Sequence, residues 1–199
     1  NFTQSNGVNT TEIDIGSSIM WNGLIGNSPA SGSTQKMTFA AWIYPIAAGS
    51  SGFSRIFSMG KTIDIFTNHV GYVGFMTNWN TTGSETQVVW FNTHAVNYNV
   101  WSHVAVTYDA TSNLNNPKCY INGSEVSFVG PKVNGGDSIA NADMTDWYGA
   151  GQSVTHGFPR CLIGNLAHPT LKNEYAFQGN IADTAIWNKV LSSEEIAAI

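Results

Sequence analysis

Short stretches in which large apolar residues alternate with small or polar ones run through most of this chain, separated by Gly, Asn, Ser and Pro. Such alternation is typical of strands with one buried face, and no helix-period stretch of ten or more residues interrupts it. The pattern predicts strands at residues 37–44, 55–59, 63–67, 72–77, 87–91, 101–108, 118–121, 161–163 and 179–187. This many strands with turns between them predicts an all-β fold of two antiparallel sheets.

Two local signals add detail to this fold. Asn122-Gly123 follows an apolar pair, and this dipeptide supplies the positive φ angles of a tight hairpin. Near the C-terminus, Ser192 precedes Glu194 and Glu195, which is the pattern of a capped helical turn. We therefore expect a hairpin at Asn122 and a short helix after the last strand.

An ordered set of segments carries a resemblance to a known family. The segments are TFAAWI (38–43), IFSMG (56–60), WSHVAVTYD (101–109), CYING (119–123), IGN (163–165) and GNIAD (179–183). Over residues 37–199 this set resembles the laminin G-like (LamG and pentraxin-type) domains of the concanavalin A-like lectin/glucanase superfamily. The resemblance implies one jelly-roll sandwich domain over residues 1–199, with first strands and an N-terminal extension in residues 1–36. The fold hosts lectins, adhesion modules, enzymes and virion proteins, so it leaves the function open.

Composition excludes some partners. Charged residues make up 11% of the 199 residues and the net charge is −5, whereas charged residues are about 25% of a typical domain. Only eight Lys and Arg residues are present, and they are scattered. Nucleic acid is therefore a poor partner, because neutralising phosphates requires clustered cations. No apolar run approaches the ~20 residues of a membrane span, so we expect no membrane insertion.

The two cysteines share strand faces with apolar residues, Cys119 with Ile121 and Cys161 with Ile163. Both are therefore expected to point inward. A buried disulfide between neighbouring strands and two reduced core thiols both fit this pattern. Zinc is disfavoured because neither cysteine belongs to a Cys-x-x-Cys pair.

One strand motif, Glu12-Ile13-Asp14-Ile15, has to be tested as a catalytic site. Retaining glucanases of the same fold carry Glu, Asp and a second Glu at alternate positions, so that two carboxylates serve as nucleophile and acid. Here Gly16 and Ser17 stand where the second Glu would be, so we interpret the motif as a solvated edge strand. His103 is interpreted as a structural residue that bonds backbone at a strand start. No nucleophile elbow, zinc-binding helix motif or phosphate loop is present, and we expect no enzyme activity.

The seven tryptophans fall into two groups. Trp42, Trp101 and Trp187 lie in the family's core strands and are expected to pack there. Trp21, Trp79, Trp90 and Trp147 differ, and two of them have polar neighbours. An exposed ring can stack on the C–H face of a sugar while amides bond its hydroxyls, although a loop tryptophan can equally cover the core. The candidate ligand-binding residues are Asn78, Trp79, Asn80, Trp147 and Tyr148.

Acidic residues suggest calcium at two places. Residues 134–158 form the longest stretch without a strand pattern, and they contain Asp137, Asp143 and Asp146. Carboxylate oxygens suit Ca²⁺, although the spacing is not that of an EF-hand. The resemblance separately implies Asp183, where many relatives carry an acidic residue and some use it as a calcium ligand. The alternatives are a solvated acidic loop for the first group and a hydrogen-bonding carboxylate at a strand end for Asp183.

These observations predict a non-catalytic carbohydrate-binding or adhesion module, stabilised by calcium, whose partner is a glycan or glycoprotein surface. The chain begins at Asn1 without Met or a basic apolar leader, which is compatible with a processed protein outside a cell or on a virion. One alternative is a structural protein of a phage particle or surface filament that contacts neighbouring modules or identical subunits. The other is a glycoside hydrolase or polysaccharide lyase of the same fold.

Overall fold

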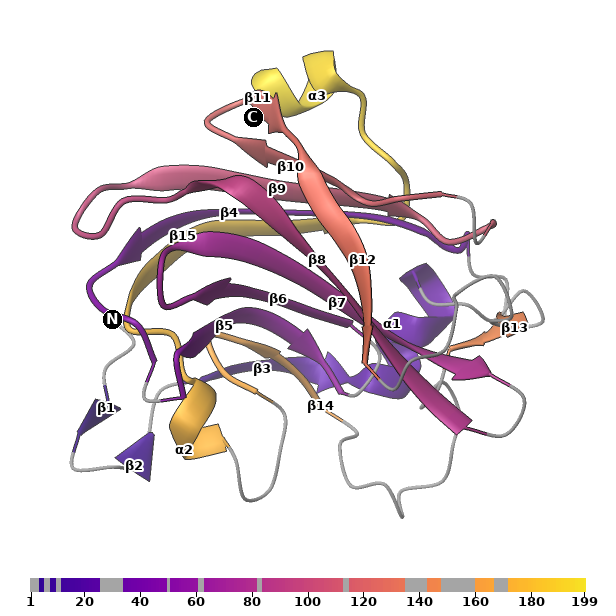
Figure 1. The fold of residues 1–199 in the computed structure, drawn as a ribbon, viewed down its shortest axis with the longest axis horizontal. Coiled ribbons are helices and arrows are strands. Elements are labelled where there is room, and N and C mark those ends of the chain that lie inside the picture. The colour runs from indigo at the N-terminus through magenta and orange to yellow at the C-terminus, as the bar shows by residue number, and fades with distance from the viewer. Residues whose placement is uncertain are drawn as a thin grey trace.

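The computed structural model describes residues 4–5, 8–9, 12–25, 34–49, 51–60, 63–81, 84–112, 115–134, 143–147, 160–166 and 172–199. Two antiparallel sheets lie in two layers (Figure 1). The small sheet has five strands in the order β11-β10-β9-β4-β15, and the large sheet has eight, ordered β12-β8-β7-β6-β5-β14-β3 with β13 paired to β7. The predicted two-sheet sandwich is therefore confirmed.

The small sheet consists of β4 (Lys36–Pro45), β9 (Ser102–Asp109), β10 (Lys118–Ile121), β11 (Ser124–Val126) and β15 (Gly179–Trp187). The large sheet consists of β3 (Ile13–Ser17), β5 (Phe53–Met59), β6 (Ile63–Asn68), β7 (Tyr72–Thr81), β8 (Ser84–Ala95), β12 (Phe128–Asn134), β13 (Asp143–Trp147) and β14 (Arg160–Ile163). A separate pair is formed by β1 (Gln4–Ser5) and β2 (Val8–Asn9). The helices are α1 (Ser18–Ile25), α2 (Lys172–Tyr175) and α3 (Ser193–Ala197).

The core lies between the two sheets and is built by the predicted alternation. Phe39, Ala41 and Ile43 of β4 point into it and are fully buried. Phe39 meets Phe57 of the large sheet with ring centroids 5.1 Å apart. All nine predicted strands are present, and β15 has the predicted bounds. By contrast, β13 lies inside the stretch expected to lack strands.

Both cysteines are buried and free. Cys119 belongs to β10 of the small sheet and Cys161 to β14 of the large sheet. A disulfide between neighbouring strands is therefore wrong, and the reduced alternative holds. Burial raises the pKa of the Cys119 thiol to about 12 and raises the pKa of the Cys161 thiol as well.

The two local sequence signals are confirmed. Asn122 (φ 50°) and Gly123 (φ 77°) form the turn between β10 and β11. Ser192 caps α3 in a capping box, because its hydroxyl accepts from the Glu195 N–H and its own N–H donates to the Glu195 carboxylate at 2.8 Å. Figure 1 shows α3 beyond β10 and β11, on the side of the small sheet away from the large one.

The helix α3 covers part of the outer face of the small sheet. Leu191 and Ile196 pack against Ala40, Ala105 and Tyr120 in a second buried cluster. None of the described helices is long and apolar enough to cross a membrane.

Candidate functional site

Four aromatic residues gather on the outer face of the small sheet, at the ends of β4 and β9 that α3 does not cover. Trp42 and His103 are partners across the two strands, with ring centroids 5.4 Å apart. Tyr44 and Trp101 lie beside them, with centroids 5.5 Å apart. We call Trp42, Tyr44, Trp101 and His103 the aromatic platform.

The two tryptophans of the platform are exposed, Trp42 at 37% and Trp101 at 43%. The expectation that they pack in the core is therefore wrong. The cause is that β4 is apolar on both faces, and Phe39 and Ile43 already occupy the face that points inward. Strand alternation places Trp42 on the opposite face.

Other tryptophans behave differently from the platform pair. Trp90 is only 1% exposed, and its Nε1–H donates to Asn116 Oδ1 at 3.2 Å, so it belongs to the core. Trp187 packs beside the cluster under α3, as predicted. The sequence did not separate these cases, because a tryptophan in a strand fits either face.

His103 forms the buried floor of the platform, with 5% exposure. Its backbone N–H donates to Asn122 Oδ1 at 2.9 Å, and its backbone carbonyl accepts from the Asn122 N–H at 2.8 Å. The ring itself packs against Trp42. Burial lowers the pKa of His103, so the imidazole is neutral at neutral pH.

Among the described residues, the neighbours of the platform on β15 carry an amide and a methyl group, and the exposed Asp183 follows them at the irregularity of that strand. Asn180 of β15 is the partner of Tyr44, and Ala182 is the partner of Trp42, so the same face continues onto β15. Ile46, two residues after Tyr44, and Val100, directly before Trp101, are 47% and 49% exposed at this end of the sheet. The surface can therefore stack against a flat apolar group, and an amide lies at its border.

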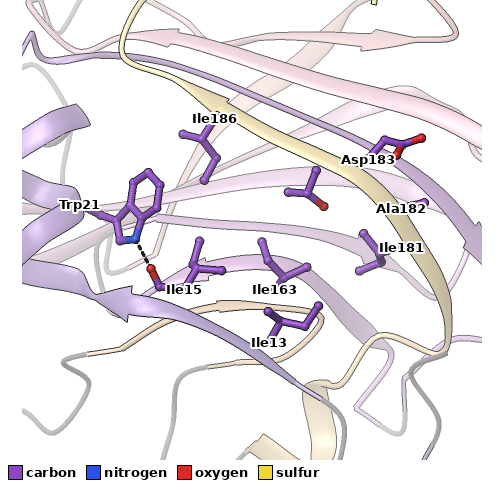
Figure 2. A pocket seen from close by; sticks show the side chains of 9 residues that line it. Ile13, Ile15, Trp21, Ile163, Ile181, Ala182, Asp183 and Ile186 are labelled. Atoms are coloured by element: carbon purple, nitrogen blue, oxygen red, sulfur yellow. Dashed lines mark hydrogen bonds between the residues drawn. The ribbon is translucent and has the colours of Figure 1, made fainter.

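A second candidate is an apolar cavity of about 400 Å³ between the edge strands of the two sheets. Figure 2 shows isoleucines from β3, β14 and β15 converging on it with Trp21. The Trp21 Nε1–H donates a hydrogen bond to the Ile15 carbonyl oxygen at 2.9 Å. Few polar groups remain for a hydroxylated ligand, so this cavity fits a sugar less well than the platform does.

Asp183, a predicted calcium ligand, lies at the rim of this cavity, and its side chain points away from the isoleucines (Figure 2). It is exposed, with φ 49°, at an irregularity in β15. Ca²⁺ takes six to eight oxygen ligands, and the described residues contain no group of three or more His, Cys, Asp and Glu side chains that could hold a metal. A bulge with a charge on an edge strand also blocks pairing with other chains. The position of Asp183 fits that role, and calcium binding at Asp183 stays a prediction.

The two predicted sugar-binding segments are brought together by the backbone. Strand β13 pairs with β7, which makes Trp147 the partner of Trp79 and Asp143 the partner of Asn80. Partner positions in antiparallel strands share one face of the sheet. For Asn78, Asp146 and these four residues the structure describes the backbone alone, and Asp137 and Tyr148 lie outside the described residues.

The acidic candidates for calcium belong to different sheets. Asp143 and Asp146 lie in β13 of the large sheet, whereas Asp183 lies in β15 of the small sheet. Calcium binding at the acidic segment stays a prediction.

The carboxylates of the strand motif are held in ion pairs. Arg160 binds Glu12 Oε1 through Nη2 at 2.7 Å and Asp14 Oδ2 through Nε at 2.8 Å. The Gly16 N–H and Arg160 together lower the pKa of Asp14, so it stays ionised and does not donate a proton. Since β3 is the edge of the large sheet, the interpretation as an edge strand is confirmed.

Residues 22–197 match the family model of the concanavalin A-like lectin/glucanases superfamily, laminin G type. The chain belongs to this superfamily. Curated protein sequences give no match. The laminin G-like resemblance drawn from the segments is therefore confirmed.

Solved structures with this superfamily fold include sialidase modules. The CBM40 of the Ruminococcus gnavus IT-sialidase, bound to α2,3-sialyllactose, has a TM-score of 0.57 at 16% identity, and 98% of each chain is covered. A variant of the NanB sialidase of Streptococcus pneumoniae has a TM-score of 0.62 at 17% identity, over 100% of this chain and 27% of that one. A Bacteroides ovatus protein proposed to bind carbohydrate has a TM-score of 0.53 at 15% identity, over 83% of this chain and 40% of its own length. At these identities the likeness shows the fold alone.

Proposed function

We propose that this domain is a non-catalytic carbohydrate-binding module and that the aromatic platform is its sugar-stacking surface. The observation that carries the proposal is the exposure of Trp42 in β4 and of Trp101 directly before β9, with the Tyr44 ring 5.5 Å from that of Trp101. An indole ring presents a large flat apolar face, and tryptophan and tyrosine are the residues on which binding energy concentrates. A pyranose ring offers a complementary apolar face of C–H groups.

The polar border of the platform supports the same function. The Asn180 amide can both donate to and accept from a hydroxyl group. Stacking with few hydrogen bonds gives a modest affinity for each site, so we expect useful binding to depend on several modules or several sugar chains. Solved structures with a similar fold include modules described as carbohydrate-binding, which is consistent with the proposal.

A second contact surface for the same glycan class is proposed at the pairing of β7 and β13. The support is that Trp79 and Trp147, chosen independently for their polar neighbours, become partners across two strands. Calcium held by Asp143 and Asp146 would stabilise this region. Differential scanning calorimetry with CaCl₂ and with EGTA tests this, and identical melting temperatures in both would contradict it.

We propose that the module acts outside a cell or on a virion, on a glycan or glycoprotein surface. The structural alternative, a filament or particle subunit, would need a sheet edge that pairs with a neighbour. On β15 the irregularity at Asp183 interrupts that edge, which favours the binding module. Light scattering separates the two, because the binding module is expected to be monomeric.

The test is binding on a glycan array followed by calorimetry on the strongest ligands. We expect Trp101→Ala and Trp42→Ala to lower affinity at least about tenfold, equivalent to about 1.4 kcal/mol. The matched variants Trp79→Ala and Trp147→Ala measure the second surface. If neither pair lowers affinity, both surfaces are wrong, and if the array and calorimetry detect no glycan, the carbohydrate-binding function is wrong.

A further inference from the structure

The described cationic side chains of this protein are all occupied by carboxylates. Each lysine and arginine whose side chain the structure describes lies within 3.3 Å of an Asp or Glu oxygen. The pairs are Lys36–Asp109, Arg55–Asp64, Lys118–Glu125, Arg160 with Glu12 and Asp14, and Lys189–Glu195. A ligand carboxylate or sulfate could bind one of these cations only in competition with its existing partner.

The two arginines are the natural receptors for a carboxylate, because their planar fork matches it. Arg55 is 8% exposed and lies between the rings of Phe66 and Tyr175, at 4.5 and 4.8 Å from their centroids. Arg160 already binds two carboxylates. Both belong to the large sheet, on strands β5 and β14, and neither is on the platform face.

The lysines whose side chains the structure describes are also remote from the platform. Lys36 and Lys118 begin β4 and β10, at the opposite end of the small sheet from Tyr44. Lys189 follows β15 and pairs with Glu195 of α3 at 2.7 Å. The platform therefore consists of three aromatic rings and a buried neutral imidazole, and the Asn180 amide lies at its border. No described cation is among these residues.

We infer that the aromatic platform selects neutral glycans, meaning pyranose chains without carboxylate, sulfate or phosphate groups, and this inference rests on the carbohydrate-binding function proposed above. An anionic group on this surface would lose part of its hydration without gaining a counter-charge. The net charge of −5 adds a repulsive field at low salt. The domain is thus expected to differ in ligand class from its structural neighbour bound to sialyllactose, although the two share a fold.

The test compares neutral ligands with acidic counterparts. Calorimetry with methyl-esterified against free oligogalacturonate changes only the carboxylates on one backbone, and lactose against 3′-sialyllactose adds a terminal sialic acid residue. Cellohexaose, xylohexaose, laminarihexaose and mannohexaose extend the neutral set. At 20 mM salt we expect the neutral member of each binding pair to bind at least about threefold more tightly, and the difference to shrink at 500 mM salt.

A gain-of-charge variant makes the inference sharper. Ala182 is the partner of Trp42, so Ala182→Arg places a guanidinium on the platform, and Ala182→Gln is the uncharged control. We expect the arginine variant alone to gain affinity for the acidic member of a pair.

The outcomes separate the two proposals. If the unaltered domain binds an acidic glycan more than threefold more tightly than its neutral match, the inference of neutrality is overturned and the carbohydrate-binding function stands. If no probe binds, the function is overturned and the inference falls with it.

Discussion

The outer face of the small sheet has two halves that come from the same strands and differ in what lies over them. In one half, Ala40 of β4 and Ala105 of β9 are buried under Ile196 of α3 and Leu191, which precedes α3. Two residues along β4, Trp42 begins the aromatic platform, which belongs to neither buried cluster among the described residues. The covered half is internal structure, and the platform is surface.

The difference shows how outward-facing positions on a strand direct packing. Small alanine side chains let a helix pack closely on the sheet. The large aromatic rings of the platform occupy the space that such a helix would need. The covered half is closed further by Thr38, whose hydroxyl donates to the Lys189 carbonyl at 2.7 Å and accepts from the Leu191 N–H at 2.9 Å. Apolar residues on a second sheet face therefore indicate either an internal cover or an external partner, and residue size distinguishes them here.

The largest expected effect on stability is at the centre of the covered half. Ile196 is fully buried, so we expect Ile196→Ala to lower the free energy of unfolding by about 2–5 kcal/mol. Trp101→Ala should cost less than half of the Ile196→Ala value, because 43% of Trp101 is already in water. Urea-induced unfolding measures both, and an equal or larger loss for Trp101→Ala would mean that the platform is structural.

The second-largest effect on stability is expected when the two hydrogen bonds of the Thr38 hydroxyl are removed. Thr38→Val keeps the shape and leaves the buried Leu191 N–H and the partly buried Lys189 carbonyl without their partner, which costs about 1–3 kcal/mol. Thr34→Val is the matched control, because Thr34 donates to the Asn188 carbonyl from an exposed position where water can replace it. We expect the control to change the free energy of unfolding by less than about 0.5 kcal/mol, and equal losses would contradict the assignment.

The helix cap is expected to contribute less. Ser192→Ala removes the acceptor for the Glu195 N–H and should lower the free energy of unfolding by about 1 kcal/mol. Ser193→Ala lies inside α3, where alanine has the higher helix propensity, so this control should be neutral or slightly stabilising. Chemical denaturation distinguishes the opposite signs, and a loss at Ser193 matching that at Ser192 would show that the cap does not hold α3.

The smallest expected effect is the contribution of His103 to the pH dependence of the free energy of unfolding. Burial lowers the pKa of His103 in the folded state, so the unfolded chain takes up this proton first as the pH falls. The neutral ring's contribution is complete above about pH 6.5 and is lost between that pH and the lower native pKa, at most about 1.4 kcal/mol for each unit of lowering. The free energy of unfolding at pH 7.5 and 5.5 should therefore fall more for the unaltered protein than for His103→Phe. Equal slopes would show that His103 is not the titrating group.

Strands with one buried face were predicted from the sequence, whereas the edge strand β12, which contains glycine and proline, was missed. The bounds of β10 and β15 were predicted correctly, those of β15 despite the irregularity at Asp183. The strand β12 was missed because it contains Gly130 and Pro131. It lies at an edge of the large sheet, with a register shift between Val129 and Lys132, and proline is tolerated at such positions. No short-range pattern distinguishes an edge strand of this kind from a loop.

The sequence by itself determined the sandwich, the hairpin at Asn122, the cap at Ser192 and the inward direction of both cysteines, because each depends on neighbours within a few residues. Only the tertiary structure decided which face of β4 points inward, that the cysteines lie in different sheets, and that Trp79 and Trp147 become partners. These outcomes depend on which strands pair and what covers each face. Such contacts join segments that are distant in the chain, and local alternation carries no information about them.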